Sequence, residues 1–277
     1  MKPAPFDYFE ATSLDEATQA LAATPDARVI AGGQSLLPLL NQRHQRCPML
    51  IDITPIEALR NQHESTDTCD LGSGITSAAI EDGAVGGVTG DFLKAVARNV
   101  GYRAVRNQGT IGGGAAFGDP AADWPAALVA LGARLTVVSA RGEREIAIEE
   151  LYRGAFETVI AQDEILTMIS VPRLSPSARW SYWKFSPTIG EVTEAIVVAI
   201  EDNEKSLRSL TLGAIGRPPR RLPELESRWA SAGDTFRDEL STAELRESVI
   251  AVAPGADDFK AQCLSVGIRR AVDECLS

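Results

Sequence analysis

The sequence predicts an α/β protein over its first two thirds, followed by an α+β domain in which helices cover a sheet. Three observations lead to this fold class. Short apolar runs alternate with helical patterns as far as Pro172, two glycine-rich tracts at residues 31–37 and 110–114 lie between such segments, and three strand-like runs precede two amphipathic helices in the last third. Residues 173–178 have the composition of a linker, so we place a domain boundary near residue 174.

The first elements surround the first glycine tract. Residues 13–23 open like a capped helix, because Ser13 can accept a bond from the amide of Glu16 and the Glu16 side chain can return it. Residues 28–31 then form a short buried strand that runs into the tract. After the tract we expect a helix with Ser35 at its N-cap, so the tract would lie between a strand end and a helix N-terminus.

The second glycine tract has similar neighbours. A helix over residues 91–100 precedes it, and Asp119 and Pro120 are expected to supply the cap and the first residue of another helix, which Gly132 ends. Further strands are expected at residues 49–53, 70–75, 134–140, 145–148 and 165–171, the third and fourth forming a hairpin.

Beyond the linker, strands are expected at residues 180–185, 195–200 and 207–215. Amphipathic patterns predict helices at residues 242–252 and 258–276. The C-terminal third therefore predicts a sheet covered by helices.

Composition and charge exclude several classes of protein. Lys and Arg total 27 against 38 Asp and Glu, which gives the 277 residues a net charge of −11. Because nucleic acid and anionic membranes repel such a chain, we expect neither as a partner. The start has no apolar leader and no run approaches the roughly 18 apolar residues of a membrane span, so we expect no membrane insertion and a cytoplasmic location.

Cysteine and histidine are too few and too scattered for a metal centre or a histidine-dependent catalytic triad. The cysteines, which we expect to be reduced and mostly buried, are Cys47, Cys69, Cys263 and Cys275. His44 and His63 lie in polar surroundings typical of solvated loops. This pattern favours chemistry carried by a cofactor, with no metal bound by this chain.

Each glycine tract has a chemical interpretation and a purely structural one. Gly32 and Gly33 would let backbone amides approach a pyrophosphate, to which Ser35 could add a hydroxyl, but an ordinary strand-to-helix turn has the same composition. The pattern is neither the G-x-G-x-x-G fingerprint nor a phosphate loop. In the second tract Thr110 offers a hydroxyl and an amide. Asp123 could accept from a ribose or ribityl hydroxyl or simply favour the helix dipole.

The run over residues 102–114, followed by residues 117–123, resembles the FAD-binding medium subunit of the molybdenum hydroxylase (xanthine dehydrogenase) family, which includes carbon monoxide dehydrogenase medium subunits. The resemblance covers essentially the whole chain. It also rests on Ala-Gly-Gly-Gln-Ser-Leu at residues 31–36, on Asp-Glu-Ile-Leu at 163–166, and on Gly-Ala-Ile-Gly at 213–216 with Pro219 and Arg220. One departure from the family pattern is the segment 185–192.

The resemblance implies a two-part FAD-binding domain of the vanillyl-alcohol-oxidase/PCMH type over residues 1–174, with subdomains of about 1–56 and 57–174. Residues 175–277 would form the C-terminal α+β domain. Carried over by position, the family pattern implies these FAD-binding residues and no catalytic ones: Val29, Ile30, Ala31, Gly32, Gly33, Gln34, Ser35, Leu36, Val100, Thr110, Ile111, Gly112, Gly113, Gly114, Asp123, Leu166 and Lys184.

Lys184 also has a physical reason to be in such a site, because a cation near the flavin pyrimidine edge would stabilise the anionic reduced ring. Without the resemblance it would be interpreted as a solvated strand lysine. The aromatic residues beside it, Trp180, Tyr182, Trp183 and Phe185, are expected to form core and interface packing.

The resemblance implies an electron-transfer subunit. The chain would pass electrons from a small [2Fe-2S] subunit through FAD to an external acceptor, and a large molybdopterin subunit would carry out hydroxylation. The assembly would be a heterotrimer or a dimer of heterotrimers. Two alternatives are a free-standing FAD-dependent oxidase or reductase of the same fold, and a scaffold that has lost its flavin.

Overall fold

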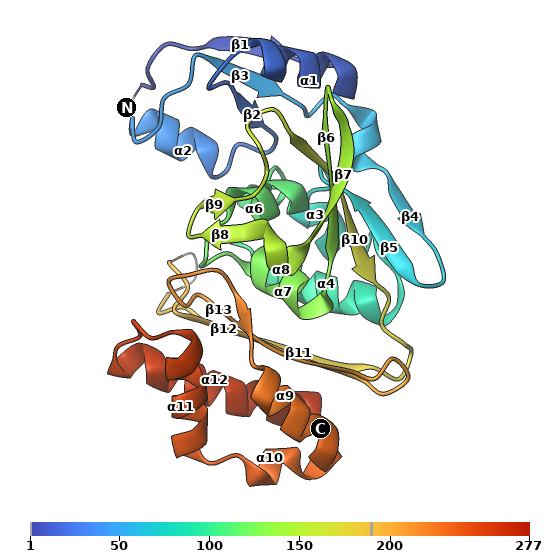
Figure 1. The fold of residues 1–277 in the computed structure, drawn as a ribbon, viewed down its shortest axis with the longest axis vertical. Coiled ribbons are helices and arrows are strands. Elements are labelled where there is room, and N and C mark those ends of the chain that lie inside the picture. Colours follow the sequence, from blue (N-terminus) through green and yellow to red (C-terminus); the bar gives the residue numbers. More distant parts are fainter. Residues whose placement is uncertain (1, 189–190) are drawn as a thin grey trace.

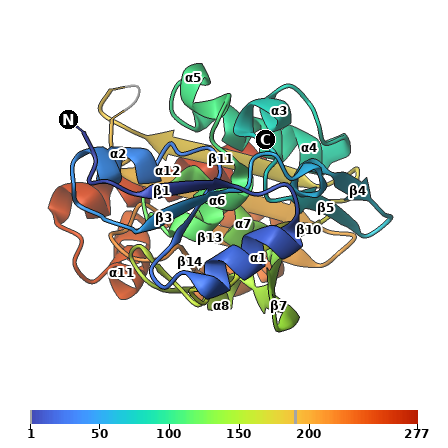
Figure 2. The same cartoon turned by 90° about the horizontal axis from the view of Figure 1, so that it is seen from above.

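The computed structural model describes residues 2–188 and 191–277. Figure 1 shows three parts along the long axis of the molecule: a small N-terminal sheet, a central sheet with helices, and a C-terminal sheet with helices beneath it. Seen from the N-terminal end, the three parts lie one over another (Figure 2). The α/β part followed by an α+β part is confirmed.

The N-terminal part is a parallel three-stranded sheet in the order β1-β3-β2. Its strands are β1 (Asp7–Glu10), β2 (Arg28–Ile30) and β3 (Met49–Asp52), and its helices are α1 (Leu14–Ala23) and α2 (Leu36–Asn41). The buried face of α1 packs with the middle strand β3 in one small apolar cluster. As predicted, the end of β2 leads directly into the first glycine tract.

The two predicted helix caps in this part differ. Ser13 caps α1, accepting from the Glu16 amide at 3.2 Å, although the Glu16 carboxylate accepts from Thr12 rather than from Ser13. Ser35 precedes α2 but makes no side-chain cap bond, so that part of the prediction is wrong. The third helical residue is Pro38, which has no N–H to donate, and the Leu37 amide is already bonded to the Gly33 carbonyl.

The central sheet is antiparallel, with the order β4-β5-β10-β6-β7. Its strands are β4 (Gln62–Glu64), β5 (Thr68–Gly72), β6 (Arg134–Ser139), β7 (Gly142–Ala147) and β10 (Ile165–Pro172). The predicted hairpin is β6–β7. His63 is exposed as expected, but it lies in the edge strand β4 rather than in a loop.

Five helices lie between β5 and β6: α3 (Ser77–Glu81), α4 (Gly87–Asn99), α5 (Arg103–Arg106), α6 (Ile111–Phe117) and α7 (Asp123–Leu131). Every residue of α7 is buried. Shorter elements complete this part: η1 (Glu57–Arg60), α8 (Ile148–Leu151), β8 (Tyr152–Gly154) and β9 (Glu157–Thr158).

Helix α7 does not begin at Asp119 and Pro120, so that prediction is wrong. The Asp119 carboxylate instead accepts from the Ala121 amide at 2.9 Å and forms a local turn. The Pro120 carbonyl accepts from the Ala214 amide at 2.8 Å, which ties this turn to the C-terminal part. The predicted end is correct, because Gly132 caps the helix in the left-handed region with φ of +66°.

The C-terminal part contains the three predicted strands, β11 (Arg179–Phe185), β12 (Ala195–Asp202) and β13 (Leu207–Gly213), with the short β14 (Arg220–Arg221) at the edge. The two predicted helices are α11 (Thr242–Val252) and α12 (Asp258–Cys275). The sequence did not reveal α9 (Pro223–Ala232), η2 (Gly233–Thr235) and α10 (Phe236–Glu239).

The C-terminal sheet is buried on both faces of its middle strand. All of β12 is buried, and its side chains alternate between two clusters. Ile196, Val198 and Ile200 belong to the core of the central part, whereas Ala195 and Val197 belong to the core formed with the C-terminal helices. The sheet is therefore an interior layer that joins the central part to the C-terminal helices.

The four cysteines are free thiols, and three of them are buried, as expected. Within the described residues, no helix combines the length and the apolar character needed to cross a membrane.

Candidate functional site

The first glycine tract touches Gln108 and Gly109, the two residues just before the second tract. A Cβ atom on Gly32 would lie 1.9 Å from the carbonyl oxygen of Gln108 and 2.8 Å from the Cα of Gly109. Only glycine permits this approach, because real Cβ atoms do not come so close to backbone. The two tracts therefore form one continuous surface, although they are far apart in the sequence.

The first tract leaves its backbone donors open. Within the described part of the chain, the N–H groups of Gly33, Gln34 and Ser35 bond to no other group of the protein. Gln34 and Ser35 are exposed, and Gly33 takes the left-handed conformation, with φ of +68°. Successive free amides on such a turn suit a bound anion.

The second tract uses its amides internally. The amides of Ile111 and Gly112 donate to the carbonyls of Ile75 and Ser73, each at 3.0 Å. The Gly113 amide donates to the Thr110 hydroxyl oxygen at 3.0 Å, and the Gly114 amide to the Thr110 carbonyl at 3.0 Å. These four amides are the first of α6, and all of them donate within the protein. The second tract is therefore bonded to the neighbouring segment around Ser73 and Ile75.

The three glycines of the second tract have different surroundings, so glycine is required at each position for a different reason. A Cβ on Gly112 would lie 2.4 Å from Ser73 Cβ, and one on Gly114 would lie 2.8 Å from Trp124 Cδ1. Packing inside the protein therefore requires both. Gly113 is exposed, and a Cβ there would meet only the Thr110 hydroxyl, at 3.0 Å. Of these three, Gly113 is the glycine whose open side faces outward.

A buried arginine supports the turn that contains Val100. Arg106 is 9% exposed and donates to the carbonyls of Val100 at 3.2 Å and Gly101 at 2.9 Å. It also forms an ion pair with Glu81, with distances of 2.8 and 3.1 Å. This hydrogen-bonded arginine lowers the pKa of Glu81 below its ordinary value. Sequence reasoning missed this pair, although Arg106 lies within the recognised motif.

Asp123 and Lys184 form a buried ion pair between the central part and the C-terminal sheet. The Lys184 ammonium group lies 2.8 Å from Asp123 Oδ1 and 3.0 Å from Oδ2, and it also donates to the Asn99 carbonyl at 2.8 Å. Asn99 is the neighbour of Val100, so the structure brings Val100, Asp123 and Lys184 together. Lys184 is therefore not a solvated strand lysine.

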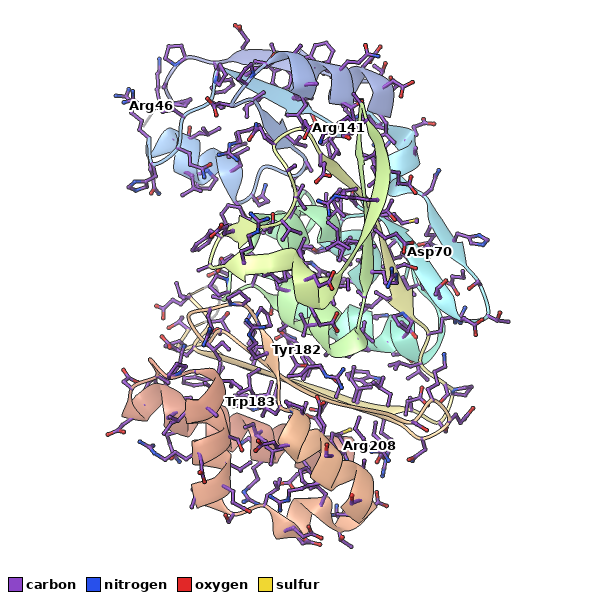
Figure 3. The ribbon with its side chains drawn as sticks, viewed as in Figure 1. Arg46, Asp70, Arg141, Tyr182, Trp183 and Arg208 are labelled. Carbon is purple, nitrogen blue, oxygen red and sulfur yellow. The ribbon has the colours of Figure 1, made fainter. Side chains whose placement is uncertain are left out.

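Asp123 has a third partner that the sequence did not indicate. The Tyr182 hydroxyl donates to Asp123 Oδ1. Asp123 is only 6% exposed, and burial raises its pKa, while the charge of Lys184 and the hydrogen bonds from Lys184 and Tyr182 oppose the rise. Figure 3 shows Tyr182 between the C-terminal sheet and the central part, with Trp183 nearer the C-terminal helices.

Leu166 is connected to the second tract through the sheet. It is 6% exposed in β10, opposite Val137. The carbonyl of its neighbour Thr167 accepts from the Ser73 amide at 2.9 Å, and the Ser73 carbonyl in turn accepts from Gly112. The hydroxyl of Ser73 is buried without a hydrogen-bond partner in the described part of the molecule.

These features fit a large phosphorylated cofactor such as FAD. The first tract offers open amides for a diphosphate, and the exposed Gly113 leaves room beside it. The buried Asp123 and Lys184 offer an acceptor and a cation for hydroxyl groups and a ring. The aromatic residues of β11 are mainly packing residues, as expected, except that the Tyr182 hydroxyl also enters this polar group.

Residues 4–174 match the family described as the FAD binding domain in molybdopterin dehydrogenase. The chain is 33% identical over 231 residues to caffeine dehydrogenase subunit beta of Pseudomonas sp. strain CBB1, covering 82% of this chain and 78% of that protein. It is 31% identical over 284 residues to 6-hydroxypseudooxynicotine dehydrogenase complex subunit alpha of Paenarthrobacter nicotinovorans, covering 100% of this chain and 96% of that protein.

Among solved structures, the reconstituted CO dehydrogenase from Oligotropha carboxidovorans contains a chain of the same fold. The TM-score is 0.89 at 26% identity, and the match covers 100% of this chain and 99% of that one.

The fold and the site together define a class of flavoprotein in which a two-part FAD-binding domain precedes an α+β domain. The chain belongs to the family of FAD-binding medium subunits of molybdenum hydroxylases. It is therefore a subunit of an oxidoreductase, and the resemblance seen in the sequence is confirmed.

Proposed function

We propose that this chain relays electrons from a [2Fe-2S] subunit, through FAD, to an external acceptor. The observation that carries the proposal is the contact of Gly32 with Gln108 and Gly109, which brings the open amides of the first tract beside the start of the second. FAD, when bound, would take up electrons one at a time from a [2Fe-2S] cluster and could pass them on singly or as a pair, which suits a relay between different partners.

In the proposed site the loop from Val29 to Leu36 binds the cofactor diphosphate, with the amides from Gly33 to Ser35 as donors. Thr110 to Gly114 form the adjoining wall, and Gly113 faces the cofactor. Asp123 accepts from a cofactor hydroxyl, Lys184 places its cation near the ring, and Val100 and Leu166 line the site. The amides of Ile111 to Gly114 do not donate to phosphate, because they are already bonded within the protein.

The proposal includes the assembly. A large molybdopterin subunit and a small [2Fe-2S] subunit would complete a heterotrimer or a dimer of heterotrimers. The names of the relatives support this, since they are called subunits or medium chains of dehydrogenases. The domain boundary near residue 174 and the cytoplasmic location stay predictions of the sequence.

The test compares the isolated chain with the complex obtained by co-expression with its partner subunits. We expect the isolated chain to bind one FAD and to show no turnover with caffeine, 6-hydroxypseudooxynicotine or carbon monoxide, the compounds in the names of the relatives. We expect FAD in the complex to be reduced only when the [2Fe-2S] subunit is present. Substrate turnover by the isolated chain would instead support the free-standing flavoenzyme, and a complex with every other cofactor but no flavin would support the scaffold.

A further inference from the structure

Asp123 has two side-chain partners in the described part of the molecule, Lys184 and Tyr182, and of these only Lys184 was expected in the FAD site. Tyr182 comes from the C-terminal strand β11, two residues before Lys184, so both side chains leave the same face of that strand. Tyr182 packs against the core of the central part, and its hydroxyl meets the first residue of α7. Two residues of the C-terminal sheet thus hold one carboxylate of the central part.

We infer that Tyr182 is a positioning residue for FAD, which holds Asp123 in the orientation that accepts a cofactor hydroxyl. The inference rests on the proposed role of Asp123. It adds that the C-terminal domain, and not the FAD-binding domain alone, sets the affinity for the flavin.

The distribution of bonds between the two carboxylate oxygens supports this inference. Oδ1 accepts from the Tyr182 hydroxyl and from the Lys184 ammonium group at 2.8 Å. Oδ2 accepts from Lys184 at 3.0 Å. Since each carboxylate oxygen has two acceptor positions, the bonds from Tyr182 and Lys184 fill those of Oδ1. Tyr182 therefore decides which oxygen is available to a ligand.

Without Tyr182, Lys184 alone would hold the carboxylate. A point-like ammonium group on a flexible chain orients a carboxylate less strictly than two donors from different directions. The buried carboxylate already bonds Lys184 through both oxygens, so without the second donor on Oδ1 it would turn more freely about the ammonium group. A cofactor hydroxyl would have to compete with the lysine for Oδ2.

The experiment measures FAD affinity of the flavin-free full-length chain by fluorescence titration. We expect Tyr182→Phe to weaken FAD binding roughly tenfold, the size of one hydrogen bond to a charged group. Tyr8→Phe is the matched control, because the Tyr8 hydroxyl also donates to an aspartate, Asp52, but in the N-terminal sheet. We expect the control to change FAD affinity less than twofold.

The same substitution in the Asp123→Asn background separates positioning from a general structural role. If Tyr182 acts through the carboxylate, Tyr182→Phe should have little further effect once Asp123 is replaced. An equal loss of affinity in both backgrounds would overturn the inference and leave Tyr182 a packing residue. Loss of affinity on Asp123→Asn without any effect of Tyr182→Phe would overturn the inference but keep the proposed site.

No effect of Asp123→Asn on FAD affinity would overturn the role of Asp123 and, with it, this inference. Should Asp123→Asn fail to fold, the reduction potential of FAD bound to the Tyr182→Phe chain provides the decisive measurement. We expect it to fall relative to the Tyr8→Phe control, because Lys184 then pairs more completely with Asp123 and stabilises the reduced ring less. An unchanged potential would contradict the inference.

Discussion

The two glycine tracts have similar compositions but opposite relations to the rest of the chain. The amides of Gly33, Gln34 and Ser35 in the first tract are open, whereas the amides from Ile111 to Gly114 in the second are all bonded inside the protein. The first tract therefore presents backbone donors that the protein itself does not use. The second is built to let protein segments approach one another, and it shapes the wall beside the first.

The difference arises from what precedes each tract. The first follows β2 at the edge of a small sheet and leads into a six-residue helix. The second lies against residues 73–77, whose carbonyls at Ser73 and Ile75 accept its amides. Composition alone does not distinguish the two cases, because glycine serves both close packing and close approach of a ligand.

The strongest test of this comparison adds a side chain at a glycine that is packed inside the protein. Gly112→Ala would place its Cβ 2.4 Å from Ser73 Cβ and 2.6 Å from the Ser73 carbonyl oxygen. Because backbone must move to relieve this overlap, we expect a loss of at least about 3 kcal/mol in the free energy of unfolding. Urea unfolding of the flavin-free chain measures it. A loss below about 1 kcal/mol would show that the second tract is not held by packing.

The second prediction concerns the ion pair beside the tracts. Asp123→Ala should weaken FAD binding by about 1.5 to 3 kcal/mol, the value of a hydrogen bond to a charged group. Titration of flavin fluorescence measures this change. An unaltered affinity would remove Asp123 from the proposed site.

The third prediction concerns the one glycine of the second tract that faces outward. Gly113→Val should change the free energy of unfolding by no more than about 1 kcal/mol, since a Cβ there meets only the Thr110 hydroxyl. We expect FAD affinity to fall at least about tenfold, which corresponds to about 1.4 kcal/mol. Full flavin occupancy in this variant would contradict the close approach of the cofactor at Gly113.

The fourth prediction contrasts two serines that precede helices. Ser13→Ala should cost about 1 kcal/mol of stability, because Ser13 caps α1. Ser35→Ala should cost less than about 0.5 kcal/mol, because the Ser35 side chain makes no cap bond. Thermal unfolding of both variants provides the comparison, and equal losses would mean that the first tract is more tightly bonded than the structure indicates.

The smallest expected effect is the pH dependence contributed by Glu81. Its folded pKa lies below the ordinary 4.5, so its contribution to stability is present above that pH and is lost as the pH falls through the folded pKa. The stability difference between the natural chain and Glu81→Gln, less than about 1 kcal/mol for a partly exposed pair, should therefore shrink on acidification. A difference that grows in acid would contradict the ion pair with Arg106.

The sequence predicted the order of the main strands and helices because hydrophobic periodicity and glycine or proline boundaries are local signals. The prediction from sequence failed where a contact between distant parts of the chain determines the local structure. Pro120 starts no helix, because its carbonyl bonds to Ala214 in another part of the chain. The missing cap bond of Ser35 has a local cause instead, because the residue expected to donate to its hydroxyl is Pro38, which has no N–H.

The contacts of the candidate site were likewise hidden from the sequence where they join distant parts of the chain. Motif position identified Asp123 and Lys184, but not that they pair with each other, since residues in α7 and β11 meet only after the two parts have packed. Tyr182 and Arg106 were missed as site partners for the same reason. No local pattern tells a packing tyrosine from one that donates to a buried carboxylate.

The burial of β12 on both faces bears on how the chain can be divided. A fragment ending at residue 174 would expose the apolar residues of the central part that now cover Ile196, Val198 and Ile200. Such a fragment is expected to aggregate rather than to act as a minimal flavoprotein, and the full chain to melt as one cooperative unit. The portion recognisable as an FAD-binding module is thus smaller than the portion that can exist alone.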